Sequence, residues 1–163
     1  MAYVIGLDIG GTKIEGILVK ATAAASASSK FPLPMVLKKI RAPTSAAAGQ
    51  KRVLTNIAAA IFSLYYYGKK NIPGFKLGGI GVGTAGFLKN GRLEMVPNIP
   101  CLKGVRFRDF LSRQLLQRKI VAPLYIENDS ICFALAEFMF GAARGCKNVI
   151  GVIVGTGIGG GLI

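Results

Sequence analysis

Two glycine-rich segments stand where apolar runs end, and both could bind an anion. The first, LDIGGTK, covers residues 7–13, and the second, GTGIGGG, covers residues 155–161. Glycine has no Cβ, so the backbone N–H groups of such a turn can come close to a phosphate. Hairpin turns that bind nothing also favour glycine, so either segment alone leaves both interpretations open. The presence of two such turns in one chain favours phosphate binding.

Three side chains of the first segment add chemistry of the same kind. Asp8 ends the apolar run, where its carboxylate can hold the water shell of a Mg²⁺ ion. Thr12 adds a hydroxyl group to the turn, and Lys13 adds a positive charge. Together with the bare backbone of Gly10 and Gly11, these groups form a candidate site for phosphate and Mg²⁺.

Two familiar nucleotide-binding patterns do not fit these glycines. The pattern G-x-G-x-x-G occurs at residues 81–86 and again at 155–160. A dinucleotide-binding turn must open a helix, yet no helix is expected directly after the first match and a strand is expected after the second. A P-loop requires lysine where this chain has Thr12. The glycine segments therefore belong to neither motif.

The elements that must position these residues alternate along the chain. Strands are expected in residues 3–7, 13–20, 35–44, 77–86, 121–129 and 148–157, and helices in residues 44–67, 106–119 and 129–141. Thr44 or Ser45 could cap the first helix, and Asp129 could cap the third. Residues 21–30, ATAAASASSK, read as a flexible loop tip. The order is typical of an α/β fold with a mixed sheet flanked by helices, and the final GLI suggests that a second hairpin opens there.

Composition and charge describe a chain that can fold but do not favour nucleic acid as its partner. The 163 residues are 52% hydrophobic and 17% charged, which is enough for a real core. The net charge is +14, but the cations are scattered in groups of two or three. Neither a run of five like charges nor a known nucleic-acid-binding motif accompanies them. We interpret most of these cations as parts of solvated faces.

The sequence also favours a cytoplasmic location. No apolar stretch reaches the length of about 20 residues that a membrane span needs, and the N-terminus does not resemble a signal peptide. Three cysteines, Cys101, Cys132 and Cys146, lack C-x-x-C spacing. They are expected to be reduced thiols that serve packing.

Five motifs in this order resemble one family. LDIGGTK, GVGTAGF, VPNIP, ENDSICFALAE and GTGIGGG are similar to the segments of the ROK sugar kinases, a group that contains many bacterial glucokinases, fructokinases and N-acetylhexosamine kinases. The resemblance covers nearly the whole chain. It implies the actin-like ATPase, or ribonuclease H-like, fold, in which two α/β domains close over ATP and a sugar. We expect the first domain in residues 1–120 and the start of the second in residues 121–163.

The resemblance also implies roles for single residues. Asp129 would be the general base that takes the proton from the attacking sugar hydroxyl, which suits phosphoryl transfer, although a helix cap alone remains an alternative. Glu127 is expected to support the loop. ATP phosphates and Mg²⁺ would be bound by Asp8, which holds Mg²⁺ through water, and by Gly10, Gly11, Thr12, Lys13, Gly155, Thr156, Gly157, Gly159 and Gly160. The sugar would be bound by Gly83, Asn98, Asn128 and Asp129.

Several features depart from the family pattern. Ala85 stands where many relatives have proline, and the segment GFLKNGRL is basic where they often carry an acidic residue. The family's kinases continue with a glutamate and a histidine that hold the sugar ring and usually with a zinc site, but this chain has no histidine. We therefore expect an N-terminal fragment of a kinase, inactive alone, with any structural Zn²⁺ confined to the missing part. The full-length protein could be a homodimer.

Two other functions compete with the kinase. The same family includes sugar-responsive transcriptional regulators, but these place a helix-turn-helix before the kinase-like body. Here LDIGGTK begins at residue 7, which leaves no room for one. A non-catalytic sugar-binding protein is the third candidate, and the presence of Asp8, Lys13 and Asp129 speaks against it.

Overall fold

The computed structural model describes residues 2–21, 32–154 and 158–163. The strands are β1 (Tyr3–Ile9), β2 (Lys13–Lys20), β3 (Met35–Pro43), β4 (Leu77–Thr84), β5 (Phe87–Lys89), β6 (Arg92–Glu94), β7 (Leu124–Asn128), β8 (Ile150–Val154) and β9 (Ile158–Leu162). The α-helices are α1 (Gln50–Asn71), α2 (Phe107–Gln117) and α3 (Asp129–Phe140), and short 3₁₀ turns occupy Ala46–Ala48 and Pro100–Leu102.

Five strands form one mixed sheet in the order β3-β2-β1-β4-β7. The neighbours β1–β2 and β2–β3 are antiparallel, whereas β1–β4 and β4–β7 are parallel. Parallel neighbours need a crossover, and α1 and α2 supply the two crossovers into β4 and β7. The C-terminal ends of β1, β4 and β7 therefore meet at one edge of the sheet.

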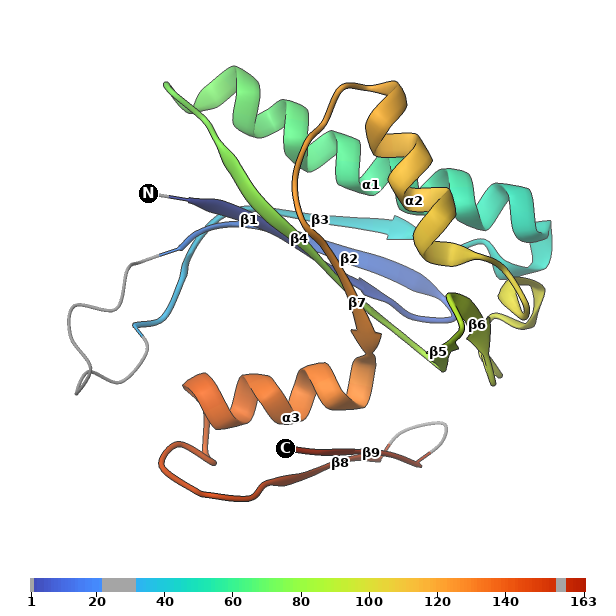
Figure 1. The fold of residues 1–163 in the computed structure, drawn as a ribbon, viewed down its shortest axis with the longest axis vertical. Helices are drawn as coiled ribbons and strands as arrows, with labels where there is room; N and C mark the ends of the chain where they lie inside the picture. Colours follow the sequence, from blue (N-terminus) through green and yellow to red (C-terminus); the bar gives the residue numbers. More distant parts are fainter. Residues whose placement is uncertain (1, 22–31, 155–157) are drawn as a thin grey trace.

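The main core lies between the sheet and the layer formed by α1 and α2 (Figure 1). Alternation along β1 turns Ile5, Leu7 and Ile9 toward these helices. Helical spacing brings an apolar stripe of α1 and α2 against them: Val53, Ile57, Ile61, Leu64, Phe107, Leu111 and Leu115 are all buried. Residues of opposite parity, such as Asp8, must then face the other side of the sheet.

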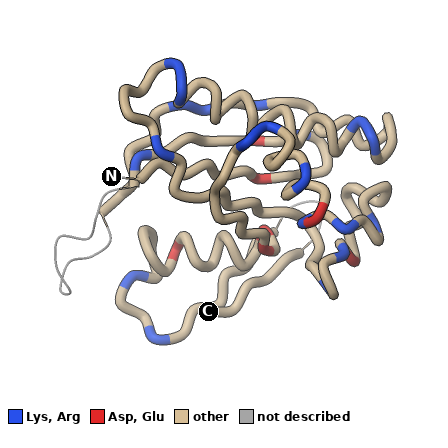
Figure 2. Tube along the Cα trace, turned by 45° about the horizontal axis from the view of Figure 1, so that its top comes forward, with Lys and Arg blue, Asp and Glu red and all other residues tan. Residues whose placement is uncertain are grey.

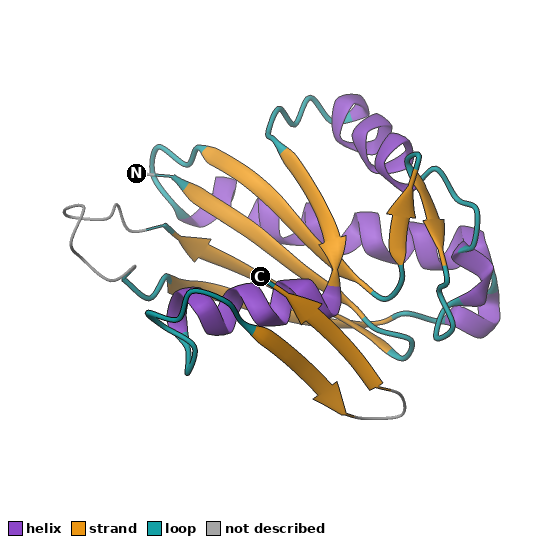
Figure 3. Ribbon diagram, turned by 60° about the horizontal axis from the view of Figure 1, so that its bottom comes forward, coloured by secondary structure: helices purple, strands orange, loops and turns teal. Residues whose placement is uncertain are grey.

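That other side is covered in part by α3 and by the hairpin of β8 and β9 (Figure 3). Glycines of the hairpin allow its backbone to pack closely against α3. A Cβ atom on Gly151 of β8 would lie 2.9 Å from the Cβ of Ala134 in α3. Because α3 follows β7 without a loop, the first turn of the helix lies at the edge where β1, β4 and β7 end.

Most elements expected from the sequence are confirmed, including the three opening strands, the three helices and the final hairpin. The predicted cap of α1 was wrong. The helix begins at Gln50 after Gly49, without a side-chain cap, because Thr44 bonds elsewhere and Ser45 takes a left-handed conformation with φ 58°. The hairpin of β5 and β6 was not predicted. The predicted loop tip falls, except for Ala21, outside the described residues.

The cations are distributed as the sequence indicated: lysines and arginines lie on helices, strands and loops around the molecule (Figure 2). Among the described residues, the structure has no helix long and apolar enough to cross a membrane.

Candidate functional site

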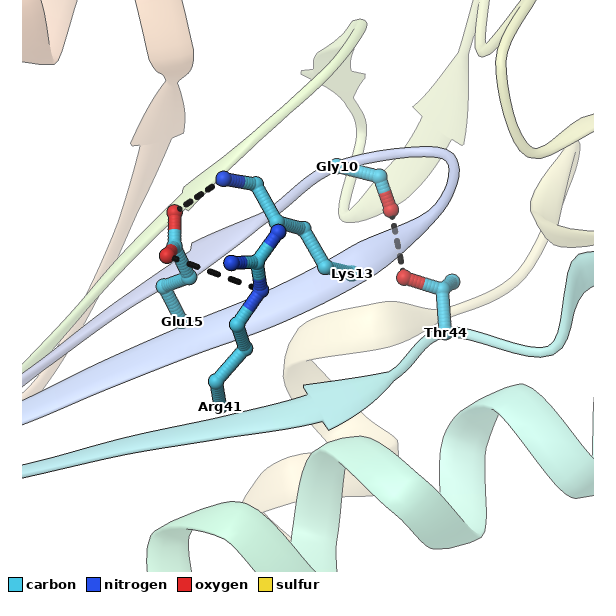
Figure 4. A network of polar contacts seen from close by, with 5 residues as sticks. All are labelled: Gly10, Lys13, Glu15, Arg41 and Thr44. Carbon is cyan, nitrogen blue, oxygen red and sulfur yellow. Dashed lines mark hydrogen bonds and ion pairs between the residues drawn. The ribbon is translucent and has the colours of Figure 1, made fainter.

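The turn of Gly10, Gly11 and Thr12, here called the phosphate turn, joins β1 to β2. The Gly10 N–H donates to the carbonyl of Lys13 at 2.9 Å and closes the turn. Thr44 holds the turn from outside: its hydroxyl donates to the Gly10 carbonyl at 2.6 Å (Figure 4), and its N–H donates to the Thr12 carbonyl at 3.0 Å. Within the described residues the N–H groups of Gly11 and Thr12 have no backbone acceptor. Two donors are thus left to an anion, as a phosphate-binding turn requires.

Asn98 lies directly against this turn. A Cβ atom on Gly11 would lie 2.8 Å from the carbonyl oxygen of Asn98 and 2.9 Å from its Cβ. Only glycine fits this approach without a shift of one segment. The structure therefore brings Asn98, predicted to contact a sugar, next to the turn predicted to contact phosphate.

A row of paired residues crosses the whole sheet beside the turn. On one side, Asp8 of β1 is paired with Gly83 of β4, which is paired with Glu127 of β7. On the other side, Asp8 is paired with Glu15 of β2, which is paired with Arg41 of β3. Residues paired across neighbouring strands project from the same face. Asp8, Glu15, Glu127 and Arg41 therefore face the side of the sheet that carries α3, with Gly83 leaving a gap between Asp8 and Glu127.

Asp8 lies in surroundings that suit a bound cation. The pKa of its carboxyl is raised from 3.8, first by partial burial and then by the nearby charges of Asp129 and Glu15, while Lys13 acts in the opposite direction. The side chain still contacts solvent, so water can reach it. Two carboxylates close enough to repel each other, Asp8 and Asp129, would be relieved by a hydrated Mg²⁺ ion, which needs only one or two carboxylates and keeps several waters.

The positive charge of Lys13 is shared with Glu15. The ammonium of Lys13 lies 2.7 Å from one carboxylate oxygen of Glu15, and Arg41 lies 3.9 Å from the other (Figure 4). These contacts lower the pKa of Glu15, with the hydrogen bond from Lys13 as the largest cause. Asp8 is paired with Glu15 in the same row, so two cations and two carboxylates balance beside the phosphate turn.

The N-terminus of α3 holds Asn128 and Asp129 in different roles. The predicted cap of α3 was wrong: the cap is Asn128 rather than Asp129, because α3 begins at Asp129 itself. The Asn128 Oδ1 accepts from the Ser130 N–H at 2.9 Å, while its Nδ2 donates to the Gly86 carbonyl at 2.7 Å. Both hydrogen bonds seen for Asp129 within the described residues use Oδ1, from the N–H and the hydroxyl of Ser130 at 2.8 and 3.4 Å. Oδ2 of Asp129 is therefore left for a further partner at a helix end that favours negative charge.

Glu127 and Cys132 complete this edge of the sheet. A carboxylate oxygen of Glu127 accepts the Asn128 N–H at 2.8 Å. A Cβ atom on Gly83 would lie 3.5 Å from the sulfur of Cys132, which places the thiol over the gap in the row. Burial raises the pKa of Cys132, and the charges of Glu127, Asp129 and Asp8 raise it further. Within the described residues, no three His, Cys, Asp or Glu side chains form a metal cage.

The second glycine segment reaches the same helix end. Gly159 lies against the Ser130 hydroxyl and Gly161 against the Ser130 carbonyl, and a side chain at either glycine would collide with these atoms. Gly160 lies between them in β9. Gly155, Thr156 and Gly157, also predicted to bind phosphate, lie outside the described residues. The part of the segment that is described thus packs beside Asp129.

Sequence reasoning missed two features of this site. Thr44 was assigned to a helix cap, because nothing local indicates a bond to a residue 34 positions away. The ion pair of Lys13 and Glu15 had a signal that was overlooked, since residues two apart in a strand share one face.

Comparison with known proteins identifies the family of this chain. A model of the ROK family matches residues 4–163. The chain belongs to the ROK family. It is 29% identical over 165 residues to a glucokinase of Streptomyces coelicolor, covering 100% of this chain and 44% of that protein. It is 33% identical to N-acetylgalactosamine kinase AgaK of a Shewanella species, and the match covers 96% of this chain and 44% of that protein.

A solved relative confirms the fold. The structure of a ROK hexokinase from Thermus thermophilus aligns with 99% of this chain and 46% of its own, with 31% identity and a TM-score of 0.74. The fold is therefore the actin-like ATPase fold of the ROK kinases, as expected. The chain spans about 44% of the length of the Streptomyces glucokinase and of AgaK.

Proposed function

We propose that this ROK chain forms the donor-phosphate site, and part of the acceptor site, of an ATP-dependent sugar kinase. The observation that carries the proposal is the meeting of Asp8, the phosphate turn and Asp129 at one edge of the sheet. The names of the relatives, glucokinase and N-acetylgalactosamine kinase, support a hexose or an amino-sugar as acceptor.

In this proposal the N–H groups of Gly11 and Thr12 bind phosphate oxygens of ATP, with Lys13 supplying positive charge. Asp8 would hold the water shell of Mg²⁺, which would supply positive charge beside the transferred phosphoryl group. The segment with Gly155, Thr156, Gly157, Gly159 and Gly160 would complete the phosphate site.

Asp129 is proposed as the general base. Its Oδ2 would accept the proton of the attacking sugar hydroxyl, while Oδ1 stays bonded to Ser130. Asn98, Asn128 and Gly83 would line the acceptor side. Asn128 already holds Gly86 and caps α3, so its remaining hydrogen-bonding capacity would serve the sugar.

The activity of the whole protein is part of the proposal, because the chain covers less than half of its relatives. We propose that residues 1–120 and 121–163 belong to two domains that close over the substrates, although β7 already lies in the first sheet. A homodimer and a cytoplasmic location are proposed for the whole protein. Catalysis needs closure to expel water and align donor with acceptor, so this chain alone should be a poor kinase.

The test uses the protein encoded by the complete reading frame. Glucose, fructose, mannose and N-acetylated hexosamines are offered with Mg·ATP, and ADP release is followed by a coupled assay. We expect release that depends on at least one sugar. Sugar binding without any sugar-dependent ADP release would instead support the non-catalytic sugar-binding protein.

A further inference from the structure

Thr44 contacts the phosphate turn but has no role in the function proposed above. It is fully buried, at 0% exposure, in the segment between β3 and the 3₁₀ turn. A buried hydroxyl needs a partner, and Thr44 has found one in the Gly10 carbonyl, at the short distance of 2.6 Å. Its N–H holds the Thr12 carbonyl as well. One residue thus binds both ends of the phosphate turn.

The direction of these two bonds matters for anion binding. A carbonyl oxygen that pointed toward a phosphate would repel it, whereas an N–H group attracts it. The carbonyls of Gly10 and Thr12 both accept hydrogen bonds from Thr44, which lies in the segment between β3 and α1. Asn98 closes the turn at Gly11, where a Cβ atom would not fit. The backbone is therefore fixed with its carbonyls held on the protein side before any ligand arrives.

Thr44 is itself held by α1. The Asn56 amide donates to the Pro43 carbonyl at 3.0 Å and lies 3.5 Å from the Thr44 carbonyl and 3.4 Å from the Ser45 hydroxyl. Ser45 takes a left-handed conformation, φ 58° and ψ 45°, which a serine adopts rarely and which needs support from its surroundings. The chain of contacts from Asn56 through Thr44 to Gly10 joins the rigid core helix to the phosphate turn.

We infer that Thr44 is a positioning residue for the donor phosphates: it presets the phosphate turn through Gly10 and Thr12 and touches no substrate itself. The inference rests on the proposed function in one respect, that this turn binds the phosphates of a nucleotide. It predicts a selective defect. Loss of the Thr44 hydroxyl should weaken binding of the nucleotide and leave binding of the sugar unchanged.

The test is Thr44→Val in the whole protein, which keeps the shape of the side chain but removes the donor. We expect the Kd for Mg·ADP and the KM for Mg·ATP to rise about tenfold, since the half-buried Gly10 carbonyl loses the partner that fixes its direction. The KM for the sugar should stay within about twofold of the wild type. Thr44→Ser keeps the hydroxyl and should restore donor binding.

Thr55→Val is the matched control. Thr55 also donates its hydroxyl to a backbone carbonyl, that of Lys51 at 2.8 Å, but on the exposed side of α1. Thr55→Val should have the same Kd for Mg·ADP and the same KM values as the wild type. If Thr44→Val does not fold, Asn56→Ala carries the test, with the same selective rise in the Kd for Mg·ADP.

Each outcome decides the inference. Unchanged affinity for Mg·ADP in Thr44→Val, an equal loss of sugar affinity, or no rescue by serine would overturn it. If the wild type shows no sugar-dependent turnover but Thr44→Val still weakens Mg·ADP binding, the positioning role stands and the proposed kinase activity fails. A wild type that does not bind Mg·ADP would overturn the inference directly.

Discussion

The contact between Gly11 and Asn98 makes a prediction that depends on steric fit alone. In Gly11→Ala the new Cβ would lie 2.8 Å from the Asn98 carbonyl and 2.9 Å from the Asn98 Cβ, whereas ordinary contact begins at 3.4 Å. The two segments must therefore separate by about 0.6 Å, and both clashing atoms belong to or adjoin backbone that cannot rotate away. Overpacking of this kind costs about 1–3 kcal/mol of unfolding free energy.

Gly81→Ala is the matched control for this substitution. Gly81 lies in β4 on the same face of the sheet as Gly83, and a Cβ atom there would meet nothing within 4 Å. Alanine at a site that accepts it stabilises a protein by about 0.4–1 kcal/mol through the unfolded chain. The two variants should thus move the stability in opposite directions.

The assay is urea unfolding of the whole protein, followed by circular dichroism, with turnover measured on the same samples. Gly11→Ala should lower the unfolding midpoint and raise the KM values for both Mg·ATP and sugar, because the turn and Asn98 are pushed apart together. Equal midpoints for Gly11→Ala and the wild type would refute the close approach. A rise in only one of the two KM values would refute the predicted joint displacement.

Three further predictions concern charge, thiol chemistry and assembly. The pKa of Asp8 is raised, so the stability contributed by its protonated form is fully present below the ordinary pKa of 3.8 and is lost as pH rises through the raised pKa. Asp8→Asn should therefore unfold at a higher temperature than the wild type at pH 7. The difference in unfolding temperature should vanish as pH falls toward 3.8, and Asp8→Asn should lose turnover with Mg·ATP. The pKa of Glu15 is lowered, so Glu15→Gln should instead unfold at a lower temperature than the wild type at pH 7. Iodoacetamide should modify exposed Cys146 well before Cys132, whose pKa is raised by burial and three carboxylates, and equal labelling rates would contradict this. The 163-residue chain alone should self-associate in sedimentation through β8 and β9, where Ile150, Val154 and Ile158 are 74%, 75% and 81% exposed, and a stable monomer would count against it.

The sequence predicted the order of the main elements because their signals are local. A short apolar run indicated β1, partial alternation after a glycine turn indicated β2, and helical spacing indicated α1 and α2. The hairpin of β5 and β6 also had a local signal that was overlooked. Asn90 and Gly91 both have positive φ, 50° and 76°, as a two-residue hairpin turn requires, and Asn-Gly is its usual sequence.

The contacts that shape the candidate site could not be predicted in the same way. The bond from Thr44 to Gly10 and the approach of Asn98 to Gly11 join residues far apart in the chain. They depend on how β3 and the segment before α2 pack around the turn, which no local pattern encodes. The candidate residues for chemistry were named from the sequence, whereas the contacts of Thr44 with Gly10 and of Asn98 with Gly11 emerged only from the fold.

The central claim, that Asp129 is the base of a sugar kinase, is tested most directly by Asp129→Asn. The amide keeps the shape of the side chain and can still accept the Ser130 N–H through its oxygen, but it cannot take a proton from a sugar hydroxyl. Asp109→Asn is the control, since Asp109 pairs with Arg106 on the surface of α2. In the whole protein, Asp129→Asn should lose about 10²–10⁴-fold in sugar-dependent ADP release while keeping most of its affinity for Mg·ADP, which is proposed to come from Asp8 and the phosphate turn. Near-normal turnover in Asp129→Asn would contradict the account and leave Asp129 with only a structural role at the start of α3.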